Sequence, residues 1–271
     1  MVSLRWDAAA ACWWWAERHS GLLLQWPRQA DHGNAAVGRW ALPDEALPLA
    51  TCQSGRLLLA QPKRLCLATP RGRSRSAWTL EPLLAVEPAE PRTSVQEGAI
   101  DRQGKLVFGT RNDSPDGRPI ASFSQYSRRH GLRRLALPTV TQATSICFSP
   151  DGTQLYFADG ALHRILQCDY DAESATVGGA REFAATVAPP GPALVDGAGM
   201  LWSVQGRQLL CYRPDGSTSA SHALPPGGPA ALALGGPQLD ELLVAWPGGR
   251  QQWRCAAASQ PAPLFDDTLP L

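Results

Sequence analysis

The sequence of 271 residues contains no long apolar run and no excess of charge of either sign. No apolar stretch approaches the roughly 18 residues that a membrane-spanning helix needs, so we expect no membrane partner. The 25 basic residues nearly balance the 24 acidic ones, which gives no reason to expect nucleic acid as a partner. The first residues also lack the basic head and apolar middle of a signal peptide, so the cytoplasm is the expected compartment.

The seven cysteines show no Cys-x-x-Cys spacing, which disfavours a zinc site and a disulfide framework. Five of them fall in apolar, strand-like runs, so we expect buried free thiols. The histidines are expected in outer strands or loops, which argues against a Ser–His–Asp triad in the site. They are His19, His32, His130, His163 and His222.

Helical periodicity is nearly absent, whereas Gly and Pro are spread along the chain, a pattern typical of short strands joined by turns. Six times the sequence repeats an apolar strand, a turn rich in Asp or Gly, and a second apolar or aromatic strand. These hairpins lie at 6–15, 49–60, 99–110, 147–159, 194–204 and 232–245. Most are followed by a third strand and several by a fourth, and repeats of roughly 40–50 residues are typical of β-propellers.

The repeats therefore predict an all-β fold: a six-bladed β-propeller of four-stranded antiparallel blades around a central channel, in a single domain over residues 1–271. One blade cannot cover its own faces, so the six blades must close into a ring that buries their aromatic side chains. The run from Trp13 to Trp15 is expected to pack between blades rather than to stack on a ligand, because neighbours along a strand point to opposite faces.

The innermost strand of each blade lines the channel, so the residues just before each hairpin converge on the axis. These segments are 1–4, 46–49, 94–98, 142–145, 189–192 and 227–230. Their polar members are Ser3, Gln96, Glu97, Gln142, Thr144 and Ser145. Glu97 is the carboxylate of this set, and it is the predicted catalytic residue.

Three segments carry a resemblance to a known family: 98–110, 145–159 and 195–202. They are similar to the gluconolactonase/regucalcin family of six-bladed propellers, and the similarity covers essentially the whole chain. The resemblance implies one divalent metal, usually Ca²⁺ or Zn²⁺, deep in the channel. In that family the metal polarises the carbonyl of a sugar lactone, and an acidic ligand helps to activate water.

The family's metal ligands, a Glu, an Asn and an Asp, fall on Val2, Thr144 and Gly191 of this chain. Valine and glycine offer no side-chain ligand, whereas Ca²⁺ needs six to eight oxygens and Zn²⁺ needs three or four His, Cys or carboxylate ligands. No cofactor is therefore expected, and Ca²⁺ or Zn²⁺ would bind only if another residue rescues the site. Asp196 is the candidate for such a rescue, although a role in a turn is favoured for it.

The family's substrate-binding Arg-x-Asn-Asp-Gly motif corresponds to residues 92–98, a segment two residues longer, with Gln96 and Glu97 in place of Asn and Asp. Arg92 matches the family arginine only if the additional residues form a bulge. The predicted ligand contacts are accordingly Arg92, Gln96, Glu97 and Thr144.

Two functions stay open at this point. In the favoured one, the chain is a divergent propeller of the lactonase family that has lost its metal centre and is weak or inert as a catalyst. Its channel then binds a small sugar-like ligand, such as a sugar lactone or sugar acid, or a protein partner. In the other, the chain is a working sugar-lactone hydrolase with a rearranged metal site, or with Glu97 acting as a general base on water without a metal.

Overall fold

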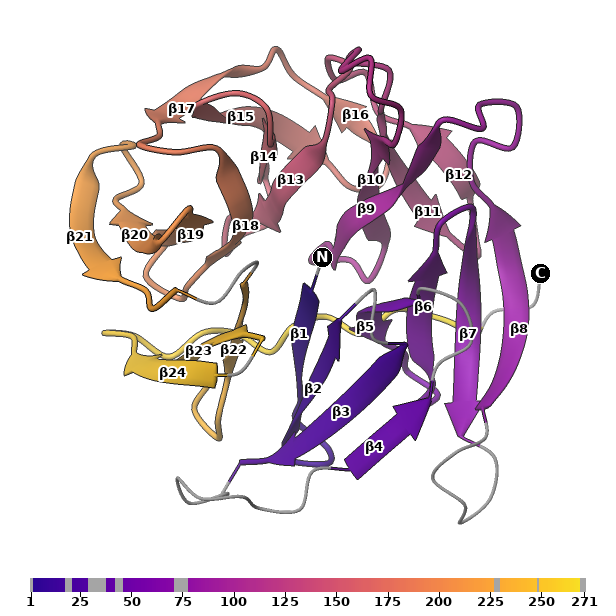
Figure 1. Cartoon of the computed structure of the whole chain (residues 1–271), viewed down its shortest axis with the longest axis horizontal. Coiled ribbons are helices and arrows are strands. Elements are labelled where there is room, and N and C mark those ends of the chain that lie inside the picture. Colours follow the sequence, from indigo (N-terminus) through magenta and orange to yellow (C-terminus); the bar gives the residue numbers. More distant parts are fainter. Residues whose placement is uncertain are drawn as a thin grey trace.

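The computed structural model describes residues 2–17, 21–28, 38–41, 46–70, 78–226, 230–247 and 249–268. In these ranges the chain forms strands β1 to β24 and no helix. The strands make six antiparallel sheets that surround a central axis (Figure 1), which confirms the predicted six-bladed β-propeller. No helix of the described part is long and apolar enough to cross a membrane.

Each blade is a meander whose first strand is innermost. Blade 1 comprises β1 (Val2–Asp7), β2 (Cys12–Glu17), β3 (Leu22–Pro27) and β4 (Gly38–Ala41). Blade 2 comprises β5 (Leu47–Thr51), β6 (Leu57–Gln61), β7 (Arg64–Pro70) and β8 (Trp78–Ala85). Blade 3 comprises β9 (Thr93–Ile100), β10 (Leu106–Asn112), β11 (Phe123–Ser127) and β12 (Gly131–Arg134).

Blade 4 contains β13 (Ala143–Phe148), β14 (Gln154–Asp159), β15 (Arg164–Asp171) and β17 (Arg181–Ala185), with the short β16 (Thr176–Val177) also paired to β15. Blade 5 comprises β18 (Pro190–Val195), β19 (Leu201–Gln205), β20 (Gln208–Tyr212) and β21 (Thr218–Ala223). Blade 6 shows three strands in the described part of the chain, β22 (Ala231–Gly235), β23 (Glu241–Trp246) and β24 (Gly249–Arg254).

The hydrophobic core is divided among the contacts between blades. The described residues form six clusters of buried apolar side chains, and each cluster joins a pair of adjacent blades. Trp13 and Trp15 pack toward blade 6, whereas Trp14, which lies between them in sequence, packs toward blade 2. This confirms the predicted packing role of these tryptophans. The ring therefore depends on all six contacts, because apolar burial is the main favourable term in folding.

The ring is closed by a segment that follows blade 6, here called the C-terminal strap (residues 256–268). Figure 1 shows it in yellow, passing from the β22–β24 sheet toward β5. Ser259 N donates to Leu239 O of blade 6 over 3.1 Å, and Phe265 N donates to Thr51 O of blade 2 over 3.1 Å. The ring of Phe265 is fully buried in the cluster between blades 2 and 3. The strap thus ties the last blade to blades on the other side of the axis.

The cysteines and histidines agree with the sequence-based expectations where the structure describes them. All seven cysteines are buried and free. His130, His163 and His222 lie in a turn, a loop and the outer strand β21, outside the lining of the central cavity. His19 and His32 lie outside the described residues.

Candidate functional site

A cavity of about 960 Å³ follows the propeller axis, and all six inner strands contribute to its wall. Strap residues 259–264 line its far end, near the last residues of the inner strands. Gln96, Glu97 and Thr144 line the cavity, as does Gly191. The structure therefore brings together three of the four predicted ligand contacts, and their roles stay predictions.

Four consecutive inner strands carry a β-bulge at a similar level of the channel. The register shifts between Pro48 and Ala50 in β5 and around Gln96 in β9. It shifts again between Thr144 and Cys147 in β13 and between Pro190 and Ala193 in β18. In contrast, β1 and β22 pair with their neighbours in unbroken register. A bulge redirects side chains and backbone groups, and bulges are over-represented next to active sites.

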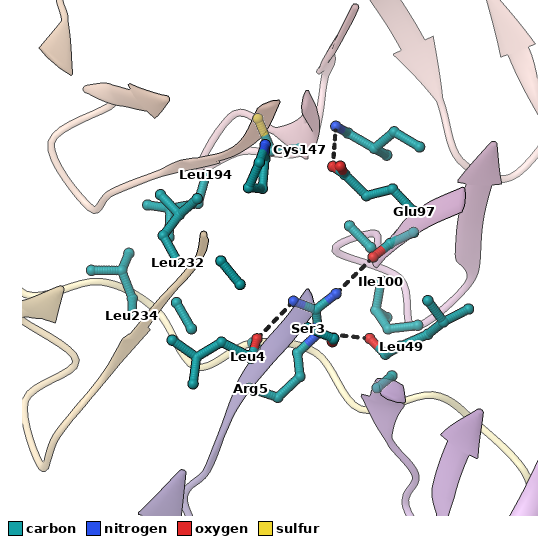
Figure 2. A pocket seen from close by; sticks show the side chains of 18 of the residues that line it. Ser3, Leu4, Arg5, Leu49, Glu97, Ile100, Cys147, Leu194, Leu232 and Leu234 are labelled. Carbon is teal, nitrogen blue, oxygen red and sulfur yellow. Dashed lines mark hydrogen bonds between the residues drawn. The ribbon is translucent and has the colours of Figure 1, made fainter. Parts of the chain in front are cut away.

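The bulge of β13 holds the carboxylate of Glu97. Ser145 has a φ of 60°, in the left-handed region that non-glycine residues seldom adopt. Successive N–H groups next to such a residue can converge on one anion. Ile146 N donates to Glu97 Oε1 over 2.9 Å (Figure 2), and the Ser145 N–H also favours the charged carboxylate. The carboxylate is thereby fixed in one orientation.

Burial raises the pKa of Glu97 to about 7, against the opposing effects of the Ile146 N–H, the Arg5 charge and the Ser145 N–H. A carboxylate with this pKa is divided between its acidic and basic forms near neutrality. It is therefore suited to accept a proton and to return it within one reaction.

Arg5 of β1 places a guanidinium at the cavity, where its charge lowers the pKa of Glu97. Its Nε donates to Leu49 O over 2.8 Å, its Nη1 to Leu4 O over 2.9 Å and its Nη2 to Gly98 O over 2.9 Å. Figure 2 shows these bonds holding the guanidinium against the cavity wall. Burial lowers the pKa of Arg5, but an arginine stays charged at neutral pH. Three of its five N–H donors are used, and two remain for a ligand.

The hydroxyl groups of the inner strands bond to neighbouring blades. Ser3 Oγ donates to Pro48 O, Thr144 Oγ1 donates to Pro190 O over 3.0 Å, and Ser145 Oγ donates to Gly191 O over 2.7 Å. Their donor hydrogens are consequently occupied by the protein itself. Gln96 Oε1, by contrast, is buried at the cavity and has no hydrogen-bond partner among the described residues.

Arg92 lies outside the residues that line the cavity. Its Nη2 contacts Glu90 Oε2 at 2.7 Å and its Nη1 contacts Asp116 Oδ2 at 3.6 Å, with the side chain 42% exposed. The predicted contact between Arg92 and a ligand stays a prediction, and in this conformation two carboxylates hold the guanidinium. Arg111 lies at the cavity wall instead, with its Nε 2.6 Å from Asp113 Oδ1.

The side chains present at the expected metal position do not fit a divalent cation. No group of three or more His, Cys, Asp or Glu residues is placed to hold a metal within the described ranges. Thr144 and Gly191 provide no charged donor, and the Arg5 charge near Glu97 disfavours a second cation. Asp196 accepts hydrogen bonds from Ala198 N, Met200 N and Trp202 Nε1, as expected of a turn residue, and it does not line the cavity.

Arg5 and Arg111 are site residues that reasoning from the sequence missed. A signal for Arg5 was present, since it is a charged residue between Leu4 and Trp6 at the start of an inner strand. An arginine in an apolar strand that must face the axis or a neighbouring blade needs hydrogen-bond partners. Arg111 gave no comparable signal, because it lies just after residues 99–110, the segment in which the sequence repeat is recognised.

Comparison with known proteins identifies the family of this chain. The model of the SMP-30/Gluconolactonase/LRE-like region matches residues 3–246. The chain belongs to this family. An L-arabinolactonase from Azospirillum brasilense is 36% identical over 160 residues, which are 57% of this chain and 53% of that protein. The chain thus matches about half of the length of this relative, and it matches 56% of a second relative from Rhizobium meliloti.

A longer match exists with a 6-deoxy-6-sulfogluconolactonase from Pseudomonas putida, 26% identical over 245 residues, 88% of this chain and 80% of that protein. Among solved structures, the calcium-binding regucalcin of Agrobacterium tumefaciens has a TM-score of 0.81 at 22% identity, covering 97% of this chain and 92% of that one. A gluconolactonase from Xanthomonas campestris has a TM-score of 0.73 at 17% identity, covering 92% and 84%. At these identities the structural likeness concerns the fold.

Proposed function

We propose that this chain hydrolyses lactones in the central cavity, with Glu97 as the general base and Arg5 as the group that stabilises negative charge on the carbonyl oxygen. The observation that carries the proposal is the placement of Glu97. Its carboxylate is held by the Ile146 N–H, lines a cavity, and has a pKa of about 7. Perturbed pKa values of this kind are concentrated at functional sites.

The reaction begins with a water molecule between Glu97 and the lactone carbonyl. As the water oxygen attacks the carbonyl carbon, Glu97 takes one of its protons, and the carbonyl oxygen becomes an oxyanion beside the Arg5 guanidinium. Collapse of this intermediate breaks the ring C–O bond. The leaving alkoxide takes the proton back from Glu97, so the product is an open-chain hydroxy acid and the carboxylate is regenerated.

The rate enhancements that this mechanism requires are ordinary for a general base and a fixed cation. A positioned general base contributes about 10²–10⁴ in rate, and loss of one oxyanion-stabilising donor costs about 10²–10³. Lactones are activated esters, so a site without a metal has less barrier to lower than one that cleaves an amide. The three backbone bonds of Arg5 fix its charge before substrate arrives, which avoids reorganisation during the reaction.

Two further observations support this function. Relatives of the chain include an L-arabinolactonase and a 6-deoxy-6-sulfogluconolactonase, so lactone hydrolysis occurs among proteins that it resembles. The cavity is also walled by all six blades, which is consistent with one domain that acts as a unit.

We further propose that Arg5 supplies here the electrophilic assistance that a metal supplies in metal-dependent hydrolases. The donor set described above does not suit Ca²⁺ or Zn²⁺. A fixed guanidinium can stabilise the same developing charge without carboxylate ligands of its own.

The test is a pH-indicator assay of purified protein on a panel of lactones, with and without a chelator, accompanied by elemental analysis. We expect turnover that survives the chelator and is lost in Glu97→Gln. Asp7→Asn is the matched control, because Asp7 is a carboxylate at the last residue of β1 that also lines the cavity. Turnover abolished by the chelator and restored by Ca²⁺ or Zn²⁺ would contradict the metal-free mechanism.

A second function is favoured by the donor set itself. If the family's chemistry requires the metal, the cavity binds a small ligand without turning it over. Absence of turnover on every lactone, together with saturable binding of one of them by calorimetry, would select this function over hydrolysis.

A further inference from the structure

We propose that the lactone taken by this site carries an apolar substituent and few hydroxyl groups, as a γ-alkyl lactone does, rather than the many hydroxyls of a sugar lactone. The proposal rests on the lactone hydrolysis proposed above. It follows from the unequal distribution of polar groups around the cavity.

One side of the cavity, here called the polar wall, consists of Arg5, Gln96, Glu97 and the Ile146 N–H. The opposite side, here called the apolar wall, consists of Leu194 of β18 and Leu232 and Leu234 of β22. Figure 2 shows these three leucines grouped across the cavity from Glu97. Leu194 and Leu234 are half-buried, so part of each side chain stays open to an occupant.

Leu232 is a buried member of the hydrophobic cluster between blades 5 and 6, and Leu194 and Leu234 pack against this cluster. The neighbouring residues that line the cavity are apolar as well: Ala193, Ala231 and Ala233. A substrate whose lactone carbonyl lies beside Arg5 therefore extends its remaining atoms toward a surface without hydrogen-bonding side chains. Burial of an alkyl chain against such a surface is favourable, roughly in proportion to the apolar area removed from water.

The hydroxyl groups of the inner strands add few free donors to the polar wall. The hydroxyl hydrogens of Ser3, Thr144 and Ser145 are donated to backbone carbonyls of the neighbouring blade. Gln96 Oε1 is a free acceptor at this level and can receive one ligand hydroxyl. Any hydroxyl of a sugar lactone that faces the apolar wall is buried without a partner, and each such group weakens binding.

The volume agrees with this reasoning. A cavity of about 960 Å³ lies within the roughly 300–1,000 Å³ of small-molecule sites, and a five-membered lactone ring would fill a small part of it. An alkyl substituent occupies the space between the ring and the leucines. Each unsatisfied hydroxyl in an apolar site is expected to lower kcat/KM by about tenfold to a hundredfold.

The first test compares lactones with the same five-membered ring: γ-heptalactone, which carries an alkyl chain, and L-arabino-γ-lactone, which carries hydroxyls. We expect kcat/KM for γ-heptalactone to exceed that for L-arabino-γ-lactone by at least about tenfold. If L-arabino-γ-lactone is hydrolysed equally well or better, this inference is wrong while the proposed function stands.

The second test changes the apolar wall. Leu234→Asn should lower kcat/KM for γ-heptalactone about tenfold and leave that for L-arabino-γ-lactone unchanged or raised. Leu132→Asn is the matched control, because Leu132 is 42% exposed on the outer strand β12 and does not line the cavity. Leu194→Asn, on a different blade, repeats the experiment should Leu234→Asn fold poorly. Equal losses on both substrates would overturn the assignment.

A third measurement separates this inference from hydrolysis itself. Calorimetry on Glu97→Gln should show tighter binding of γ-heptalactone than of L-arabino-γ-lactone, with a negative heat-capacity change for the alkyl ligand. If no lactone is turned over by the wild-type protein, the proposed function fails, and this binding preference alone decides the substrate class. Equal binding of the two ligands, or no binding of either, would overturn it.

Discussion

The polar and apolar walls of one cavity are built by the same repeated hairpin, yet they differ in backbone as well as in side chains. On the polar side, the bulges of β9 and β13 turn Glu97 and the Ile146 N–H toward each other. On the apolar side, β22 keeps an unbroken register and presents leucine and alanine. In this propeller the irregular strands β9 and β13 hold the candidate base Glu97, whereas the regular strands β1 and β22 supply Arg5 and apolar surface.

The largest effect is expected from removing the charge that distinguishes the polar wall. Glu97→Gln should lower kcat about 10²–10⁴-fold, because the amide cannot accept the proton of the attacking water. Steady-state assays on the best lactone measure this, and Asp7→Asn should keep the activity within a few-fold. An unchanged kcat in Glu97→Gln would show that the polar wall is not the reacting side.

The pH dependence of kcat/KM tests whether Glu97 and Arg5 of the polar wall act together. The general base acts when ionised, so kcat/KM in the wild-type protein should rise with pH and level off above the pKa of Glu97, about 7. Arg5→Gln should lower kcat about 10²–10³-fold and move this rise to higher pH, since the Arg5 charge lowers the pKa of Glu97. The control is Arg102→Gln, at a cavity arginine whose Nη1 bonds the strap at Pro261 O. A lower kcat without a shifted profile would assign Arg5 a role independent of Glu97.

The buried Glu97 carboxylate of the polar wall should also destabilise the folded protein above neutral pH. The pKa of Glu97 in the folded protein, about 7, lies above its ordinary value of 4.5, so folding favours the protonated form. The stability gained from this preference is fully present below the ordinary pKa of 4.5, and it is lost as the pH rises through about 7. Glu97→Gln should therefore be more stable than wild type by about 3 kcal/mol near pH 8, and similar to it near pH 4. Thermal unfolding across this range measures the difference; a constant difference would contradict it.

The smallest effect is expected at Cys147, which lines the cavity beside Glu97. Burial, together with the neighbouring carboxylate, raises the pKa of its thiol well above the ordinary value, so it is not a nucleophile at neutral pH. Cys147→Ala should keep kcat/KM within about twofold, and thiol reagents should leave the native protein active. Inactivation by such a reagent that Cys147→Ala prevents would add a nucleophile to the polar wall.

The fold was predictable because its signals are local. The turn after β9 illustrates this: Asp101 Oδ1 accepts hydrogen bonds from Gln103 N and Lys105 N, both over 2.9 Å, and Gly104 supplies a φ of 80°. An Asp-x-x-Gly sequence specifies such a turn by itself. Repetition of the hairpin then gave the number of blades, and the starts of the inner strands gave Gln96, Glu97 and Thr144.

The site was only partly predictable because its geometry comes from contacts between blades. The pKa of Glu97 depends on burial and on the N–H groups of Ile146 and Ser145, which belong to a different blade. The bulge of β13 directs the hydroxyl hydrogens of Thr144 and Ser145 to carbonyls of blade 5, a contact that no local pattern reveals, and the predicted ligand contact of Thr144 stays a prediction. Arg5 was overlooked because its partners lie on β5 and β9, which no local pattern in β1 reveals.

The C-terminal strap has a consequence for the order of folding. Ser54 of blade 2 bonds Asp267 of the strap across 213 positions of sequence, and Arg56 pairs with the same carboxylate at 2.7 Å. Contacts of such separation form slowly, because a long loop must close before they contribute any stability. We therefore expect single blades to form early and the strap to dock last. In pulse-labelling hydrogen exchange, the amide of Phe265 should become protected after those of β13 and β14, whose pairing is local.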